Sequence, residues 1–177
     1  MIIVHDIKQL SPEWFALRED LWTGSTAIKL LQGKSMPRSY EWGGNDATRR
    51  GQALEAPAIL EYQRIYRTKV QRPGFITNTV YTNAGYSPDG IDRKTLLEIK
   101  AFNGIRHEAL VRGDIPLEVL TQILFGMVVT GLRKARLLAF NPEYEDQLTV
   151  IDIPYDKLIG DNIRKKLRLD MEKRKLL

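Results

Sequence analysis

The sequence predicts a mixed α/β or α+β protein in which helices flank a mixed central sheet. Three observations lead to this prediction. Helical patterns open the chain, residues rich in Val, Ile, Thr and Tyr fill its middle, and a helix, two strands and a last helix complete it. The 177 residues are 43% hydrophobic and 28% charged, which fits one domain, residues 1–177, with its own core.

The chain begins with two short helical patterns. Ser11 and Pro12 are typical of a helix start, and apolar residues then recur at helical spacing up to residue 21. We expect Ser25 to cap a second short helix that ends at Gly33. Both helices would precede the longer elements of the core.

Residues 33–46 have no periodicity and contain glycines and a proline, so they indicate a loop. Tyr40 and Trp42 in this loop could stack on bases. They could equally close a small core, because aromatic side chains are often simply buried.

The longest helical pattern covers residues 46–67, and Pro57 inside it should kink the helix or split it in two. Residues 69–86 indicate one or two strands with a break at Pro73-Gly74, and the strand LLEIKAF follows.

The second half alternates helices and strands. Residues 104–113 are expected to be helical, and residues 115–130 fit a buried helix that begins near Pro116. The segments ARLLAF and QLTVIDI predict a hairpin, and residues 156–177 predict a basic helix with an apolar stripe. Its charges are typical of a solvated helix face, although contact with DNA phosphates would also suit them.

Composition excludes several kinds of site. The chain has no cysteine, which excludes disulfides, iron–sulfur clusters and thiolate zinc sites. No apolar run is long enough to cross a bilayer, and the first residues do not resemble a signal peptide, so we expect a cytoplasmic protein without a membrane partner. The net charge of +5 favours anionic partners, nucleic acid first.

One stretch, YSPDGIDRKTLLEIK at residues 86–100, places charged residues in an apolar strand. Because strand side chains alternate between faces, Glu98 and Lys100 should point the same way while Leu97 and Ile99 point into the core. A hairpin through the intervening turn would bring Asp89 back beside Glu98. Two carboxylates and a lysine would then converge on one patch.

Two interpretations of this patch are open. Carboxylate oxygens, together with the Ile99 backbone carbonyl, suit Mg²⁺ or Mn²⁺, and Lys100 could orient or deprotonate a water or neutralise a phosphate in the transition state. The other interpretation is a solvent-exposed Glu98/Lys100 pair beside a common turn. The spacing alone favours the exposed pair, since short motifs often arise by chance.

Further motifs surround this stretch in a fixed order. SPEWFALREDLWTGS, RRGQALEAPAILEY, YSPDG, LLEIK and LTQILFGMVVTG follow one another between Ser11 and about Pro142. With these motifs the chain resembles the phage lambda exonuclease-like family of PD-(D/E)xK nucleases, the viral recombinase or alkaline exonuclease group. The resemblance implies a PD-(D/E)xK restriction-endonuclease-like core.

The resemblance also implies roles for individual residues around the metal. Asp89 and Glu98 would be the principal metal ligands, with the Ile99 carbonyl as a further ligand and Lys100 as the catalytic lysine. Glu55 on the long helix would be an additional acidic group near the metal, bound through water. Judged on its own position, Glu55 could also be an ordinary solvated residue.

Three more residues would bind or position DNA by the same resemblance. Gln122 would position water or the scissile phosphate, although a buried glutamine can also make a purely structural hydrogen bond. Arg18 and Ser25 would bind a terminal 5′-phosphate, and an arginine fork and a helix start both suit an anion. Taken singly, a surface arginine and a capping serine are the simpler interpretations.

The function implied by the resemblance is a Mg²⁺-dependent 5′→3′ exonuclease, with Mn²⁺ as a substitute, that acts on double-stranded DNA ends and leaves 3′ single strands for recombination. A trimeric ring around DNA and a single-strand annealing protein as partner are also implied. The alternatives are an endonuclease, a single-strand-specific nuclease, or a DNA-binding module without activity.

Two departures from the family pattern accompany the resemblance. Residues 78–86, NTVYTNAGY, lack a carboxylate that some members carry, so a second metal site would be weaker or would depend on Glu55 and waters. The stretch before the GQALEAP helix is also shorter than in the lambda enzyme, which puts strand separation by a wedge in doubt.

Overall fold

The structure, a computed structural model, describes residues 1–36 and 46–175. Tyr40 and Trp42 therefore lie outside the described residues. The helices and strands are, in chain order, β1 (Ile2–His5), α1 (Pro12–Arg18), the 3₁₀ helix η1 (Gly24–Thr26), α2 (Ala27–Leu31), α3 (Asp46–Tyr66), β2 (Phe75–Asn78), β3 (Gly85–Tyr86), β4 (Gly90–Asp92), β5 (Thr95–Lys100), α4 (Gly104–Val111), α5 (Leu117–Thr130), β6 (Lys134–Phe140), β7 (Leu148–Pro154) and α6 (Lys157–Lys175).

The central sheet is mixed, as the sequence predicts. Its strand order is β4-β5-β6-β7, with β5 and β6 parallel and the two outer pairs antiparallel. A second sheet, with the order β1-β2-β3, is antiparallel throughout. The second sheet is an addition to the predicted fold, because β1 pairs with a strand about seventy residues further along the chain.

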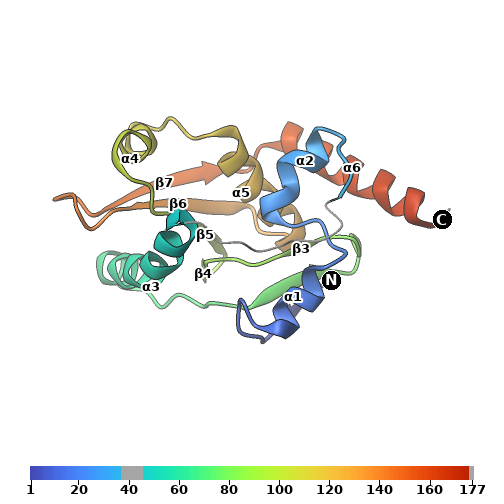
Figure 1. Cartoon of the computed structure of the whole chain (residues 1–177), viewed down its shortest axis with the longest axis horizontal. Coiled ribbons are helices and arrows are strands. Elements are labelled where there is room, and N and C mark those ends of the chain that lie inside the picture. Colours follow the sequence, from blue (N-terminus) through green and yellow to red (C-terminus); the bar gives the residue numbers. More distant parts are fainter. Residues whose placement is uncertain (37–45, 176–177) are drawn as a thin grey trace.

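Helices cover both faces of the central sheet (Figure 1). On one face α3 packs Ala58 and Tyr62 against Leu97 and Ile99 of β5. On the other face α5 packs its apolar side chains against a larger core that includes Leu96. Strand β5 therefore lies between two cores, and this arrangement confirms the predicted sheet flanked by helices.

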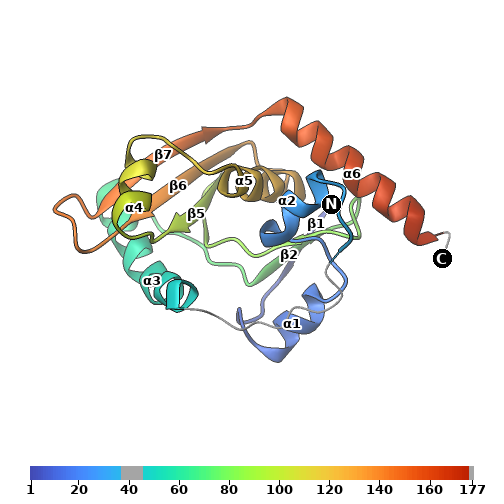
Figure 2. The same ribbon diagram turned by 45° about the horizontal axis from the view of Figure 1, so that its top comes forward.

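Helix α5 crosses the centre of the molecule, and α2 and α6 both pack against it and against each other (Figure 2). It is buried along most of its length and ends at Gly131, which adopts the left-handed conformation (φ 76°). The predicted basic helix at the C-terminus is also confirmed, with Ile163 and Leu167 buried on its apolar stripe. None of the helices in the described ranges is long and apolar enough to cross a membrane.

The sequence predicts that Pro57 either kinks the helix or divides it in two, and α3 continues past Pro57, so the division does not occur. Pro57 is exposed, and the carbonyl of Ala53, which loses its hydrogen-bond donor there, also belongs to an exposed residue. Water can reach that carbonyl, while Ala58 and Tyr62 on the opposite side are fully buried. Packing against the sheet holds the helix together across the proline.

The short helices differ in how well the sequence predicted their starts. Ser11 caps α1, since its side chain accepts a hydrogen bond from the Trp14 N–H (3.3 Å). The predicted cap at Ser25 is wrong, because Thr23 and Thr26 form a reciprocal capping box around η1. Ser25 lies inside that 3₁₀ turn, with an exposed side chain.

Candidate active site

The site is built on the β4–β5 hairpin. Gly90 pairs with Leu97, so the turn returns Asp89 to the end of β5. Asp89 Oδ2 accepts a hydrogen bond from the Ile99 N–H (2.7 Å). The hairpin thus brings Asp89 to the strand that carries Glu98 and Lys100, as the alternation of the sequence predicts.

Strand β4 begins at Gly90, opposite Leu97, while β5 continues for three residues after Leu97. Continuing the register of Gly90 and Leu97 would place Pro88 opposite Ile99. The N–H and C=O of one strand residue point to the same edge of the strand. The Ile99 carbonyl is therefore directed, like its N–H, toward Pro88, and a proline has no N–H to donate to it. The Ile99 carbonyl oxygen therefore has no backbone N–H opposite it and lies beside the Asp89 carboxylate.

Glu98 is buried, with 1% of its surface exposed. Its Oε2 accepts a hydrogen bond from the Tyr86 hydroxyl (2.6 Å), and its Oε1 accepts from Lys100 Nζ (2.7 Å) and from Gln122 Nε2 (2.6 Å). A buried carboxylate requires such donors, because removal from water otherwise destabilises its charge. The interpretation of Glu98 and Lys100 as a solvent-exposed pair is therefore wrong.

Lys100 lies at the open side of this cluster, and 18% of its side chain is exposed. Its ammonium also donates to Gln122 Oε1 (3.1 Å), so the glutamine contacts both charged residues. Burial acts to lower the pKa of Lys100, but the charges of Glu98 and Asp89 outweigh burial and raise the pKa above its ordinary value. In the metal-free site Lys100 is therefore a cation.

Burial and neighbouring carboxylates disfavour the ionisation of Asp89 and of Glu55. Burial, followed by the charges of Glu98 and Glu55, raises the pKa of Asp89 well above its ordinary range. Burial also raises the pKa of Glu55, where the attraction of Arg72 opposes it and the charge of Glu98 adds to it. Excess negative charge at one site is the condition that a bound cation relieves.

The donor atoms at this edge fit a divalent ion. Asp89 and Glu98 supply carboxylate oxygens and Ile99 supplies a carbonyl, and Mg²⁺ is commonly held by one or two carboxylates together with waters. Within the ranges that the structure describes, no group of three or more His, Cys, Asp or Glu side chains could hold a metal. Asp89 and Glu98 lie together on the hairpin, whereas the Glu55 carboxylate is bound by Arg72, so the residues present suit one ion on the Asp89/Glu98 pair.

Glu55 extends from α3 toward the hairpin but is held by Arg72. Arg72 Nη2 donates to Glu55 Oε2 (2.8 Å), and Arg72 Nε donates to the Asp89 backbone oxygen (3.3 Å). This arginine was not among the predicted site residues.

Arg18, the last residue of α1, contacts the segment that directly precedes the β4–β5 hairpin. Its guanidinium packs over the Trp14 ring at 3.9 Å from the ring centroid, and its Nη1 donates to Ser87 Oγ (3.3 Å). Trp14 Nε1 donates to the same oxygen (2.8 Å). Ser87 lies two residues before Asp89 in the sequence. Its hydrogen bond therefore holds Arg18 near a predicted metal ligand.

Ser25 lies on a neighbouring wall of the site. Its hydroxyl contacts the Thr23 hydroxyl (3.1 Å). The preceding residue, Gly24, packs directly on Gln122 and Tyr86, because a Cβ at Gly24 would lie 3.0 Å from Gln122 Cγ and 2.8 Å from Tyr86 Cε2. The absence of a side chain at Gly24 brings η1 close to the buried end of the active-site cluster.

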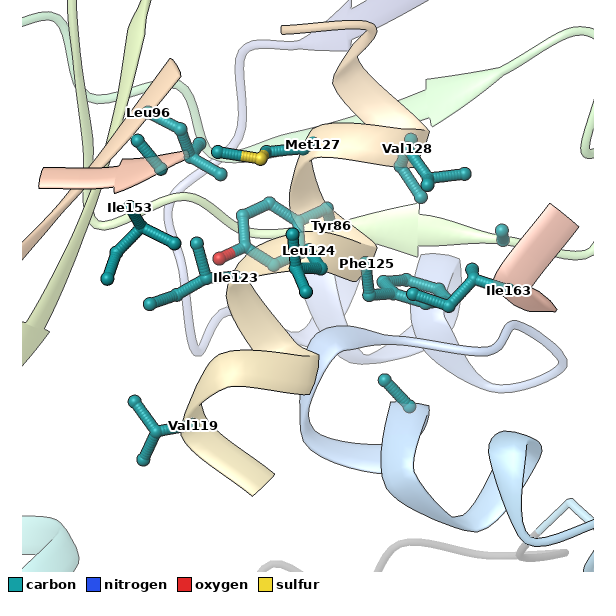
Figure 3. Close-up of a cluster of buried hydrophobic side chains, with 14 of the residues drawn as sticks. Tyr86, Leu96, Val119, Ile123, Leu124, Phe125, Met127, Val128, Ile153 and Ile163 are labelled. Carbon is teal, nitrogen blue, oxygen red and sulfur yellow. The ribbon is translucent and has the colours of Figure 1, made fainter. Parts of the chain in front are cut away.

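Tyr86 is a site residue that the sequence did not single out. Figure 3 shows its ring beside α5 among the apolar side chains of the larger core. Gly24 contacts the ring, and a Cβ at Gly126 of α5 would lie 2.5 Å from Tyr86 Cζ. The two glycines hold the ring so that its hydroxyl reaches Glu98. Its place directly before Ser87-Pro88-Asp89 was the available signal.

A mixed sheet between helices, with Pro88-Asp89 directly before the first strand of a hairpin and Glu98 and Lys100 on the second strand, defines the PD-(D/E)xK class of fold. Residues 13–133 match the model of the YqaJ-like viral recombinase domain, and the chain belongs to this family. No curated protein matches the chain significantly.

Solved structures share the fold. An alkaline exonuclease (LHK-Exo) from Laribacter hongkongensis superposes with a TM-score of 0.78 at 23% identity, over 92% of each chain. LHK-Exo in complex with dAMP gives a TM-score of 0.79 at 24% identity, also over 92% of each chain. A phage related exonuclease from Haemophilus somnus 129PT gives 0.59 at 14% identity, over 86% of this chain and 92% of the other. At these identities the likeness establishes the fold.

Proposed function

We propose that this protein is a divalent-metal-dependent deoxyribonuclease that degrades double-stranded DNA ends in the 5′→3′ direction and leaves 3′ single strands for phage-type recombination. The observation that carries the proposal is the buried Glu98, held by Lys100, Gln122 and Tyr86 at the end of the hairpin that carries Asp89. Membership of a viral recombinase family and the shared fold of two exonucleases support it.

In this proposal Asp89, Glu98 and the Ile99 carbonyl hold Mg²⁺, for which Mn²⁺ can substitute. When bound, the ion supplies a Lewis acid that lowers the pKa of a water and binds a phosphate oxygen. Tyr86 donates to Glu98 Oε2 and so fixes the orientation of that carboxylate.

Lys100 and Gln122 act on the reacting phosphate. A lysine whose pKa is raised is protonated at neutral pH, which favours stabilisation of phosphate charge over removal of a proton from water. Gln122 donates through Nε2 to Glu98 and accepts through Oε1 from Lys100, so it fixes the distance between the metal ligand and the cation. Glu55 contributes negative charge from α3 at the rim of the site.

Arg18 and Ser25 bind the terminal 5′-phosphate in this proposal. The Trp14 ring and Ser87 hold the Arg18 guanidinium beside the turn that carries Asp89. A guanidinium that is already ordered loses little conformational freedom when it binds a phosphate. Recognition of the 5′ end at this position would place the first phosphodiester bond near the metal ligands.

Linear duplexes with a 5′-phosphate or a 5′-hydroxyl, incubated with Mg²⁺, test the proposal. Wild type should degrade the phosphorylated duplex faster, and Lys100→Ala should lose about 10²–10³-fold in rate while still binding DNA. Arg18→Ala should remove the preference for 5′-phosphate, whereas Arg64→Ala, which breaks an exposed ion pair with Glu61, should keep it. An Arg18→Ala variant that kept the full preference would contradict the phosphate assignment.

The same assay separates the alternatives. Nicking of a closed circular plasmid would identify an endonuclease, and degradation of single strands alone would identify a single-strand-specific nuclease. A purified protein that cleaves no DNA with Mg²⁺ or Mn²⁺ would be a binding module. The trimeric ring and the single-strand annealing partner stay predictions, which the mass of the assembly in solution, alone and with an annealing protein, would test.

A further inference from the structure

Arg72 occupies a position that the backbone of the metal hairpin fixes. Gln71 and Ile91 exchange two backbone hydrogen bonds (2.9 and 2.8 Å), which add one residue pair to the free edge of β4. Arg72 directly follows this pair and therefore stands next to the turn of Asp89. Its placement is part of the fold of the hairpin.

The Arg72 side chain bridges α3 and the hairpin. Nη2 donates to Glu55 Oε2 at 2.8 Å, and Nε donates to the Asp89 backbone oxygen at 3.3 Å. Only 26% of the Glu55 side chain is exposed, against 43% of the Arg72 side chain. The guanidinium thus occupies a Glu55 carboxylate oxygen that could otherwise bind a cation, and it is the more exposed of the two partners.

The charges of the cluster limit how many ions it accepts. Glu55, Asp89 and Glu98 contribute three negative charges, and Lys100 and Arg72 contribute two positive charges, so the formal sum is −1. One divalent ion brings the sum to +1, and a second would bring it to +3. Removing the Arg72 charge lowers the starting sum to −2, and two ions then give +2. Arg72, bound to Glu55, therefore raises the electrostatic cost of a second cation beside that carboxylate.

We propose that Arg72 is a positioning residue that takes the place of a second metal ion, a role that rests on the proposed metal-dependent nuclease function. It holds Glu55 away from metal coordination and restricts the free enzyme to one divalent ion on Asp89 and Glu98. The geometry agrees with a site for one ion, because Asp89 and Glu98 share the hairpin while the Glu55 carboxylate is bound by Arg72. So does the sequence of residues 78–86, which has no carboxylate.

Titration with Mn²⁺, followed by the electron paramagnetic resonance of the free ion at pH 8 without DNA, tests this proposal. Wild type should bind one ion for each chain. Arg72→Gln should bind a second, weaker ion, and the double variant Arg72→Gln/Glu55→Gln should return to one. Arg72→Lys keeps the charge and should bind one ion.

Arg64→Gln is a matched control, because Arg64 pairs with Glu61 on the exposed surface of α3, the helix that carries Glu55. It should bind one ion like wild type. Two ions in wild type, or one ion in Arg72→Gln, would overturn the proposal for Arg72 while leaving the nuclease function intact. Binding of no Mn²⁺ by any variant would overturn both the proposal for Arg72 and the metal-dependent function.

Discussion

The hydroxyl of Tyr86 should stabilise the protein measurably, and Tyr86→Phe isolates its contribution. The ring is 1% exposed, and its hydroxyl donates to Glu98 Oε2 at 2.6 Å. The other donors to Glu98, Lys100 and Gln122, both bind Oε1. Phenylalanine keeps the packing against Gly126 but leaves a buried carboxylate oxygen facing a phenyl ring.

A hydrogen bond to a charged group contributes about 1.5–3 kcal/mol. For a domain of this size, a loss of ~2 kcal/mol corresponds to a fall in Tm of about 4–8 °C. Thermal unfolding in EDTA, followed by circular dichroism, measures this fall.

The difference between the two proteins should also depend on pH. Burial, with the charges of Glu98 and Asp89, raises the pKa of Tyr86 well above its ordinary value. The stabilisation by the hydroxyl is therefore fully present below about pH 10, the pKa of an unfolded tyrosine, and declines at higher pH. The Tm difference should be equal at pH 7 and pH 9.

Tyr155→Phe is the matched control. Among the described residues the Tyr155 hydroxyl is buried and has no hydrogen-bond partner, while its ring packs against the guanidinium of Arg133. Its removal should not lower the stability, because no bond is lost and a buried hydroxyl without a partner carries a desolvation cost. Equal losses in Tyr86→Phe and Tyr155→Phe would refute the role given to the Tyr86 hydroxyl.

Two further predictions concern the same cluster. Gly126→Ala places a methyl group 2.5 Å from Tyr86 Cζ. In denaturant titrations it should lower the free energy of unfolding by about 1–2 kcal/mol, after the gain in helix propensity is subtracted. Gly51→Ala in α3 meets nothing within 4 Å and should raise the free energy of unfolding by up to ~1 kcal/mol. If both substitutions stabilised the protein, the close approach of α5 to Tyr86 would be wrong. Because burial and the neighbouring carboxylates raise the pKa of Asp89, metal-free wild type should lose stability as the pH rises from about 4 through that raised pKa. In EDTA at pH 8 the Tm of Asp89→Asn should therefore be no lower than that of wild type. When Mn²⁺ replaces EDTA, the Tm of wild type should rise and that of Asp89→Asn should not. A rise in the Tm of the variant with Mn²⁺ would contradict the role of Asp89 as a metal ligand.

Features of the fold that depend on neighbouring residues could be predicted from the sequence. The cap at Ser11, the buried helix α5 and the hairpin of β6 and β7 follow from local patterns and have the expected positions. The alternation of β5 also holds, since Leu97 and Ile99 belong to one core while Glu98 faces the other side. These features depend on backbone geometry, which a short segment determines.

Features that depend on distant partners could not be predicted. Strand β1 pairs with β2, which follows α1, η1, α2 and α3 in the chain, and Arg72 contacts Glu55 between α3 and the hairpin. The cap at Ser25 failed for a local reason. Thr23, Ser25 and Thr26 all carry hydroxyl groups, and the sequence does not say which pair closes the capping box.

Pro88 has a consequence for the motion of the site. Hairpin ends usually fray and close again, and an ordinary residue opposite Ile99 would form and break a hydrogen bond to its carbonyl. Proline has no hydrogen to offer, so thermal motion of the hairpin cannot close this edge by extending the ladder. Pro88 therefore cannot occupy the carbonyl oxygen with a backbone hydrogen bond, and in the proposed site a metal ion need not displace such a partner in order to reach it.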